Sequence, residues 1–155
     1  MTRVKVLVVG IGNEDCGDDA AGLLVARSLR EKGLPGMAVH ELCGDATSLL
    51  EIWQGAATVY LIDAVSSGAV PGTLHRMDAG EIDPNRNVLR FSTHSASLLS
   101  VVELGRLLGQ LPRQVIIFGI EGKAFAAGEE LSPAARCGIE KAMAAILDEI
   151  KNQSE

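Results

Sequence analysis

The sequence predicts an α/β protein in which a mostly parallel sheet is covered by helices on both faces. The first observation is that strand-like apolar runs alternate with helical patterns of roughly 10–20 residues. The second is that Val4–Val9, Thr58–Ile62 and Gln114–Ile120 are almost continuously apolar, which is typical of strands buried on both faces. The third is the length, because 155 residues with 47% hydrophobic residues suit one domain with a sizeable core. We therefore expect a single domain, residues 1–155, with about five strands.

The first half of the chain contains three predicted strands and two predicted helices. The strand Val4–Val9 ends at Gly10, the first glycine of a tight turn. A helical spacing of apolar residues begins near Asp18 and ends at Gly33, a residue type common just after helix C-termini. The remaining elements of this half are the strand Met37–Cys43, the short helix Ala46–Trp53 and the strand Thr58–Ile62. Asp63 is then expected at the C-terminal end of the third strand.

The second half begins with Thr73–Met77, which we expect to be an edge strand, and continues with a polar loop over residues 78–87. His94 leads into a helix whose apolar face is formed by Leu98, Leu99, Val102 and Leu108. The strand Gln114–Ile120 follows. The last helix starts at Ser132-Pro133, where serine is a capping residue and proline suits the first turn. No internal repeat and no linker interrupts this order.

Four carboxylates lie between the first strand and its helix: Glu14, Asp15, Asp18 and Asp19. A strand, a glycine turn and a helix often open a nucleotide site, but the third glycine of the dinucleotide fingerprint is replaced by Asp15 and no Gly-Lys-Ser/Thr is present. Carboxylates repel a phosphate and attract a cation. One aspartate is explained by capping of the helix and by its dipole, but four are not. The turn therefore indicates a cation site rather than a nucleotide site.

Composition excludes several classes of function. The net charge is −6 and the aromatic residues are three Phe, one Tyr and one Trp, which disfavours nucleic-acid binding. No apolar run approaches the roughly 20 residues of a membrane helix. The start, MTRVKVLVVG, has no cleavage site, so we expect a first strand and a cytoplasmic protein. The three cysteines form no CxxC pair, and we expect each to be a small buried residue rather than a ligand.

Asp19, Asp63 and His94 form the candidate metal site. In parallel sheets ligands bind beyond the C-terminal ends of the strands. Asp19 follows the first predicted strand, Asp63 ends the third, and His94 opens the helix after the loop at 78–91, which a regular topology places at the same edge. Two carboxylates and an imidazole suit nickel, zinc, copper or iron, and without a thiolate the set is unlike a structural zinc site. Structural interpretations also stand: Asp63 can form an Asx turn and His94 can flank a helix cap. For His40 and His75, both within predicted strands, we expect only a structural role.

Three segments together resemble the maturation endopeptidases of [NiFe] hydrogenases: GIGNEDCGDDAAG at 10–22, LIDAVSSGAVPGTLHRMD at 61–78 and FSTHSASL at 91–98. GEELS at 128–132 resembles a late loop of the same family. The resemblance implies a three-layer α/β/α sandwich. It also implies removal of a short C-terminal extension from the precursor of the hydrogenase large subunit after nickel insertion. The partner would be that precursor, while nucleic acid and membrane are not expected and the oligomeric state is left open.

The resemblance also assigns roles to individual residues. The second acid of the family's DD pair is Asp19, the aspartate of its IDA motif is Asp63, and the histidine of its S-x-H motif is His94. These three are therefore the expected metal contacts and catalytic residues. Nickel would be carried by the substrate, with no permanent organic cofactor. Asp18 would support the site or cap the helix.

Two departures from the family pattern concern substrate choice. The family's DGGT-like segment corresponds here to CGDATS at 43–48, where Asp45 is the nearest acid. The DD pair is followed by two alanines before Gly22, where many members have glycine at once. Neither departure removes an expected metal contact.

The expected mechanism is that these residues detect nickel in the substrate and that one carboxylate accepts a proton during cleavage. One alternative is a non-proteolytic nickel-binding assembly factor or scaffold on the same fold. Another is a serine hydrolase using Ser92, Ser95 or Ser97 with His94, which is disfavoured because no G-x-S-x-G elbow is present.

Overall fold

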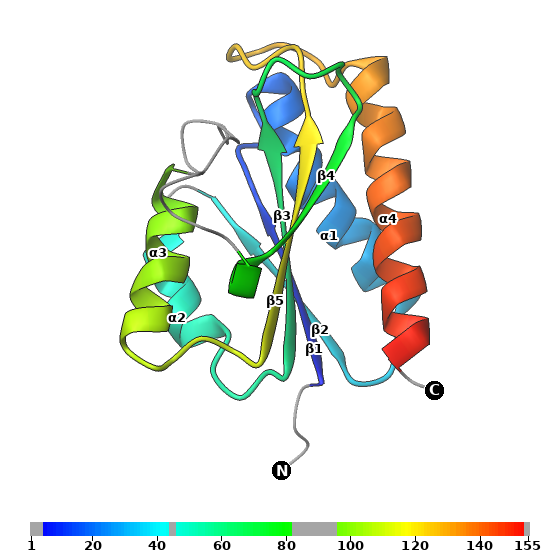
Figure 1. Cartoon of the computed structure of the whole chain (residues 1–155). Coiled ribbons are helices and arrows are strands. Elements are labelled where there is room, and N and C mark those ends of the chain that lie inside the picture. Colours follow the sequence, from blue (N-terminus) through cyan, green and yellow to red (C-terminus); the bar gives the residue numbers. More distant parts are fainter. Residues whose placement is uncertain (1–4, 44–45, 82–95, 154–155) are drawn as a thin grey trace.

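The computed structural model describes residues 5–43, 46–81 and 96–153, and these residues form a twisted five-stranded sheet (Figure 1). The strands are β1 (Val6–Ile11), β2 (Met37–Leu42), β3 (Thr58–Val65), β4 (Leu74–Asp78) and β5 (Gln114–Glu121). Their order across the sheet is β2-β1-β3-β5-β4. β4 is antiparallel to β5, and all other neighbours are parallel. This confirms the predicted α/β fold and the mostly parallel sheet.

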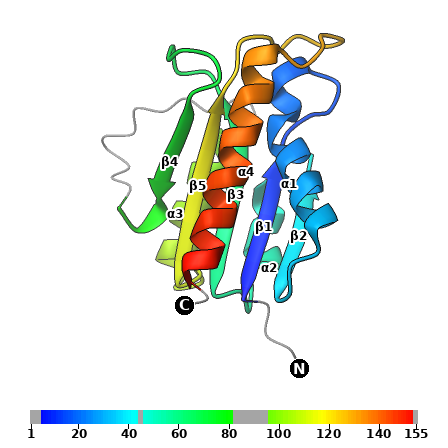
Figure 2. The ribbon, with the colours of Figure 1, turned by 90° about the vertical axis from the view of Figure 1, so that its right-hand side faces the viewer.

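Helices cover both faces of the sheet, as Figures 1 and 2 show. The helices α1 (Ala21–Lys32) and α4 (Pro133–Gln153) lie on one face, and α2 (Leu49–Ile52) and α3 (Ala96–Leu107) lie on the other. Each face has its own apolar core: Tyr60, Ile62 and Phe118 pack beneath α1 and α4, and Leu61, Ile117 and Trp53 pack beneath α2 and α3. The three-layer sandwich follows from this division.

The three central strands are buried, as their apolar runs predict. Every residue of β1 and β3 is buried, whereas β2 and β4 at the sheet edges are only partly buried. β3 is longer than expected, because Asp63, Ala64 and Val65 continue the ladder with β5. Asp63 therefore lies inside the strand rather than at its end. A charged residue was a misleading sign of a strand end, since the backbone pairing continues past it.

Close backbone contacts fix the start of α1 against the sheet. A Cβ atom on Gly22 would lie 2.3 Å from the carbonyl oxygen of Ile62 in β3. A Cβ atom on Gly10 would lie 2.2 Å from the carbonyl oxygen of Gly22. No side chain fits at distances below about 3 Å, so only glycine permits this packing. The start of α1 is thereby held beside Asp63.

Several helix ends differ from the sequence-based prediction. Asp18 belongs to a 3₁₀ turn, η1 (Gly17–Ala20), and α1 starts only at Ala21. The predicted helix at 46–53 is a 3₁₀ turn, η2 (Ala46–Ser48), followed by the single turn of α2. β4 is followed by a further 3₁₀ turn, η3 (Ala79–Glu81). The cap of α4 is confirmed, since the Ser132 hydroxyl accepts a hydrogen bond from the Ala135 amide at 3.1 Å.

Two further expectations concern membranes and cysteines. Among the described residues, no helix combines the length and the apolarity that a membrane crossing requires.

The expectation of buried cysteines was wrong, because Cys43 and Cys137 are exposed and Cys16 is half-buried. Cys43 follows an edge strand and Cys137 lies on a helix that is only half covered, so neither position is enclosed by the sheet. All three are free thiols.

Candidate active site

The four carboxylates of the acidic turn divide into two exposed and two buried groups. Glu14 and Asp15 are exposed, and Glu14 forms a two-pronged ion pair with Arg27 at 2.8 and 3.2 Å. The Arg27 guanidinium holds the pKa of Glu14 below its usual value. Asp18 and Asp19 are 0% and 4% exposed. Only the second pair can therefore form part of an enclosed site.

Asp18 is fully engaged with a distant loop. One carboxylate oxygen accepts the Ser132 amide at 2.7 Å, and the other accepts the amides of Lys123 and Ala124 and the Ser132 hydroxyl at 2.8–3.0 Å. Burial acts to raise the pKa of Asp18, but these hydrogen bonds together outweigh it and lower that pKa. Asp18 caps neither η1 nor α1. It fixes the acidic turn against residues 123–132 instead.

Asp19 lies in η1, where a glycine lets the turn fold tightly around it. A Cβ atom on Gly12 would lie 2.0 Å from the Asp19 carbonyl oxygen, so only glycine fits there. That oxygen accepts the Asn13 amide at 3.2 Å, and the Asp19 amide donates to the Cys16 carbonyl at 3.1 Å. These bonds hold Asp19 at the C-terminal end of β1.

Asp63 is completely buried in β3. One of its carboxylate oxygens accepts the amide of Ala64 at 2.8 Å. η1 packs against β3, and β1 is the strand next to β3 in the sheet. The structure thus places Asp19 and Asp63 on neighbouring elements at one edge, where the parallel strands end. We call this the C-terminal edge of the sheet, meaning the side where the parallel strands have their C-terminal ends, as distinct from the edge strands β2 and β4.

His94 lies outside the described residues, so the complete set of Asp19, Asp63 and His94 stays a prediction. Within residues 5–43, 46–81 and 96–153, no three histidine, cysteine or acidic side chains gather as a metal site. Asp45, the candidate substrate-contacting acid, and the serines Ser92 and Ser95 also fall outside the described part. The described contribution to the expected metal site is therefore the two buried aspartates.

Glu121, His75 and Ser67 form a polar cluster at the same edge that sequence reasoning missed. Glu121 is 2% exposed and accepts hydrogen bonds from the Ser67 amide, the Ser67 hydroxyl and His75 Nε2. The position of His75 within a strand predicts only a structural role for this residue. The available signal was the position of Glu121 directly after the apolar run Gln114–Ile120, just as Asp63 follows Thr58–Ile62.

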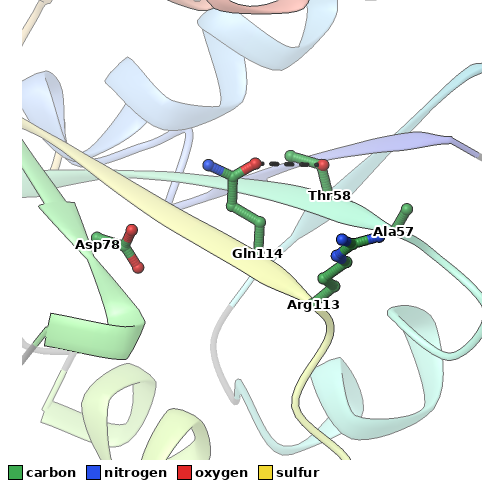
Figure 3. Close-up of a pocket in the computed structure, with 5 residues that line it drawn as sticks. All are labelled: Ala57, Thr58, Asp78, Arg113 and Gln114. Atoms are coloured by element: carbon green, nitrogen blue, oxygen red, sulfur yellow. Dashed lines mark hydrogen bonds between the residues drawn. The ribbon is translucent and has the colours of Figure 1, made fainter. Parts of the chain in front are cut away.

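A cavity lies at the opposite edge, where the parallel strands begin. It has a volume of about 460 Å³ and is lined by Ala57, Thr58, Asp78, Arg113 and Gln114 (Figure 3). The Thr58 hydroxyl approaches the Gln114 side-chain oxygen at 3.5 Å. We call this the N-terminal edge. Because it is separated from Asp19 and Asp63 by the length of the strands, the cavity is not part of the candidate active site.

Comparisons with known proteins agree with the motifs. Residues 25–149 match the family model of the hydrogenase maturation protease HycI. The match includes Asp63 and the position of His94 and begins after Asp19. A putative hydrogenase maturation protease of Methanocaldococcus jannaschii is 27% identical over 157 residues, which cover 97% of this chain and 99% of that protein.

Another relative is considerably longer than this chain. The hydrogenase expression/formation protein HupD of Thiocapsa roseopersicina is 26% identical over 119 residues, or 76% of this chain. The matched segment spans only about half of that relative, 54% of its length. Among solved structures, the [NiFe] hydrogenase maturation protease HybD of Thermococcus kodakarensis superposes with a TM-score of 0.75 at 28% identity. The superposition covers 94% of this chain and 98% of that one.

Proposed function

Because this chain belongs to the hydrogenase maturation protease family, we propose that it is an endopeptidase that removes the C-terminal extension of a [NiFe] hydrogenase large subunit. The observation that carries the proposal is the placement of Asp19 and Asp63 on adjacent elements at the C-terminal edge of the sheet, both buried. Burying a carboxylate is costly, so two at a ligand-binding edge favour chemistry over structure. The proposal also places the reaction in the cytoplasm, the compartment expected from the sequence.

In this proposal nickel belongs to the substrate, bound within the large subunit. Asp19, Asp63 and His94 would contact that nickel and so restrict cleavage to a metal-loaded precursor. The desolvated carboxylates suit this role, because a charged group out of water interacts strongly with a cation. A carboxylate at this edge would accept a proton from the water that attacks the scissile carbonyl carbon, and the departing amine would leave protonated.

Asp18 does not contact nickel in this proposal, although it neighbours Asp19. Both of its oxygens already accept hydrogen bonds from residues 123–132. Its role is to hold η1, and with it Asp19, in a fixed position. The two acids of the DD pair thus have different functions: Asp18 anchors the turn and Asp19 faces the substrate.

The experiment is incubation of the chain with nickel-loaded and nickel-free large-subunit precursor, followed by mass spectrometry of the large subunit. We expect a shortened product from the nickel-loaded precursor alone, and loss of that product in Asp19→Asn, Asp63→Asn and His94→Gln. Asp15→Asn is the matched control, because Asp15 is an exposed acid of the same turn.

Two results would contradict the proposal. Equal cleavage of both precursors would show that the chain does not recognise nickel. Full activity of all three variants would show that these residues take no part in the mechanism. An uncut large subunit that stays bound to this chain through nickel would instead support the alternative of a non-proteolytic assembly factor.

A further inference from the structure

Glu121 is a buried carboxylate for which the proposed mechanism has no role. It is the last residue of β5, at the C-terminal edge of the sheet. One carboxylate oxygen accepts the Ser67 amide at 2.9 Å, and the other accepts the Ser67 hydroxyl at 2.5 Å and His75 Nε2 at 3.1 Å. The side chain thus joins the ends of three segments: β5, the residues after β3, and β4.

The backbone of Glu121 binds the far end of the same connection. Its amide donates to the Thr73 carbonyl at 2.9 Å, and its carbonyl accepts the Gly72 amide at 2.8 Å. One residue therefore holds both ends of the loop formed by residues 66–73. Between these two anchors the loop protrudes, and Val70 near its tip is 76% exposed.

This loop lies directly beside the proposed catalytic carboxylate. β3 ends at Val65, two residues after Asp63, and the loop begins there. Asp63 pairs with Gly119 of β5, and Gly119 pairs with His75 of β4. Paired residues of neighbouring strands point to the same face of a sheet. Asp63 and His75 therefore lie in one row across the sheet, with Glu121 two residues beyond Gly119 on the same face.

Stability alone does not account for this cluster. An enclosed carboxylate with an imidazole partner costs desolvation free energy, and an apolar side chain of similar size at such a site often stabilises a protein as well or better. A polar cluster in which every hydrogen bond is made instead fixes the relative positions of the segments that it joins. The geometry defined here is that of the loop rather than that of Asp63, whose strand is paired on both sides independently of the Glu121 side chain.

We propose that Glu121 is a positioning residue whose carboxylate fixes the loop of residues 66–73 as a contact surface for the polypeptide substrate, the large-subunit precursor. This inference rests on the proposed function for the identity of the substrate. A loop fixed in advance loses less conformational entropy on binding. Loss of the anchor should therefore weaken substrate binding and raise KM, while kcat stays the same because Asp63 does not move.

The first test changes the exposed tip of the loop, where folding is not at risk. In Val70→Asp we expect the Kd for nickel-loaded precursor to rise about tenfold, the range of a single interface residue. Leu107→Asp is the matched control, since Leu107 is equally exposed, at 77%, but lies at the end of α3 near the N-terminal edge. Its Kd should stay within about twofold of the wild type, the usual range of non-contact positions.

The second test changes the anchor itself. Glu121→Gln keeps the shape of the side chain but replaces an acceptor oxygen with a donor amide facing the donors of Ser67 and His75. We expect KM to rise about fivefold or more with kcat within about twofold. Glu149→Gln is the control: it removes the ion pair of Arg76, the next residue of β4, without touching the loop. Urea unfolding of each variant shows whether the fold persists.

The outcomes separate this inference from the proposed function. A wild-type chain that binds the precursor but never cuts it would reject the peptidase, and the Kd values would still test the loop. A Val70→Asp Kd equal to that of the wild type would overturn the inference, as would a folded Glu121→Gln variant with unchanged KM or with only kcat reduced. If Glu121→Gln does not fold, the Kd values of Val70→Asp and Leu107→Asp for the precursor are sufficient to support or reject the inference.

Discussion

The polar groups at the two edges of the sheet differ in how far they are exposed to solvent. At the C-terminal edge four carboxylates are at most 4% exposed: Asp18, Asp19, Asp63 and Glu121. At the N-terminal edge a cavity of about 460 Å³ is lined by partly exposed polar side chains, among them Arg113 and Asp78 (Figure 3). A hollow forms wherever side chains leave space, whereas a desolvated carboxylate must be held against a free-energy cost. For this reason we place the proposed reaction at the buried carboxylates rather than at the cavity.

The largest expected difference between the edges concerns cleavage of the large subunit. Asp63→Asn keeps the shape of the side chain and removes its charge, so we expect cleavage to fall by about 10²-fold or more, the range for loss of a proton-transferring group. Arg113→Gln, at the cavity, should cut at the wild-type rate. Initial rates of product formation measured by mass spectrometry check both. A large loss in Arg113→Gln with an intact Asp63→Asn would reverse the assignment of the edges.

A second difference concerns stability. Asp18→Ala leaves the buried amide of Ser132 and the partly buried amides of Lys123 and Ala124 without their acceptor. A buried unsatisfied donor costs about 1–3 kcal/mol and a partly buried one less, so we expect the free energy of unfolding to fall by about 2 kcal/mol or more. At the N-terminal edge, Thr58→Val removes one long hydrogen bond and should cost less than about 1 kcal/mol. Urea denaturation measures both, and equal losses would show that the edges do not differ in this respect.

A third difference concerns backbone packing. Gly22→Ala places a methyl group 2.3 Å from the Ile62 carbonyl oxygen, and we expect a loss of about 1–3 kcal/mol despite the better helix propensity of alanine. Gly80→Ala, near the N-terminal edge, meets only a side-chain oxygen of Asp78, at 3.3 Å, among residues 5–43, 46–81 and 96–153, so its effect on the free energy of unfolding should be small. Thermal unfolding checks both. A harmless Gly22→Ala would show that the start of α1 can move away from β3.

The smallest expected effect appears only at high pH. Burial, with a contribution from the Glu149 carboxylate, raises the pKa of Tyr60 to about 12, and the Gln153 amide donates to the Tyr60 hydroxyl. A raised pKa means that stability is complete below the ordinary tyrosine value of about 10 and falls as pH rises toward the folded value. The chain has one tyrosine, so tyrosinate absorbance reports it alone. A midpoint near 10 in the folded protein would contradict this.

Most of the fold was predictable because its signals are local. Val4–Val9, Thr58–Ile62 and Gln114–Ile120 are apolar runs whose tendency to form strands can be read from neighbouring residues alone, and they correspond to β1, β3 and β5. The cap at Ser132 is likewise a local pattern. The prediction fails where tertiary pairing decides the structure: the sequence places Asp63 at a strand end, whereas its pairing with Gly119 of β5 places it within β3.

The candidate site was predictable only in part, for the same reason. Asp19 and Asp63 follow apolar strands, so their edge was evident from the sequence. The separate role of Asp18 was not, because its partners lie more than 100 residues further along the chain. The partners of Glu121 are 46 and 54 residues away. No local pattern connects a histidine in an edge strand with a glutamate at the end of a distant one.

The long-range hydrogen bonds of Asp18 also determine how much of the chain must be synthesised before the acidic turn can be anchored. A nascent chain that has left the ribosome only as far as residue 122 lacks every one of the four donors that hold this carboxylate. Until Ser132 emerges, the acidic turn lacks the anchor that Asp18 provides, because domains fold as units once their long-range contacts are available. If the proposed function holds, we expect a ribosome-bound fragment that ends before Ser132 to leave the large-subunit precursor uncut.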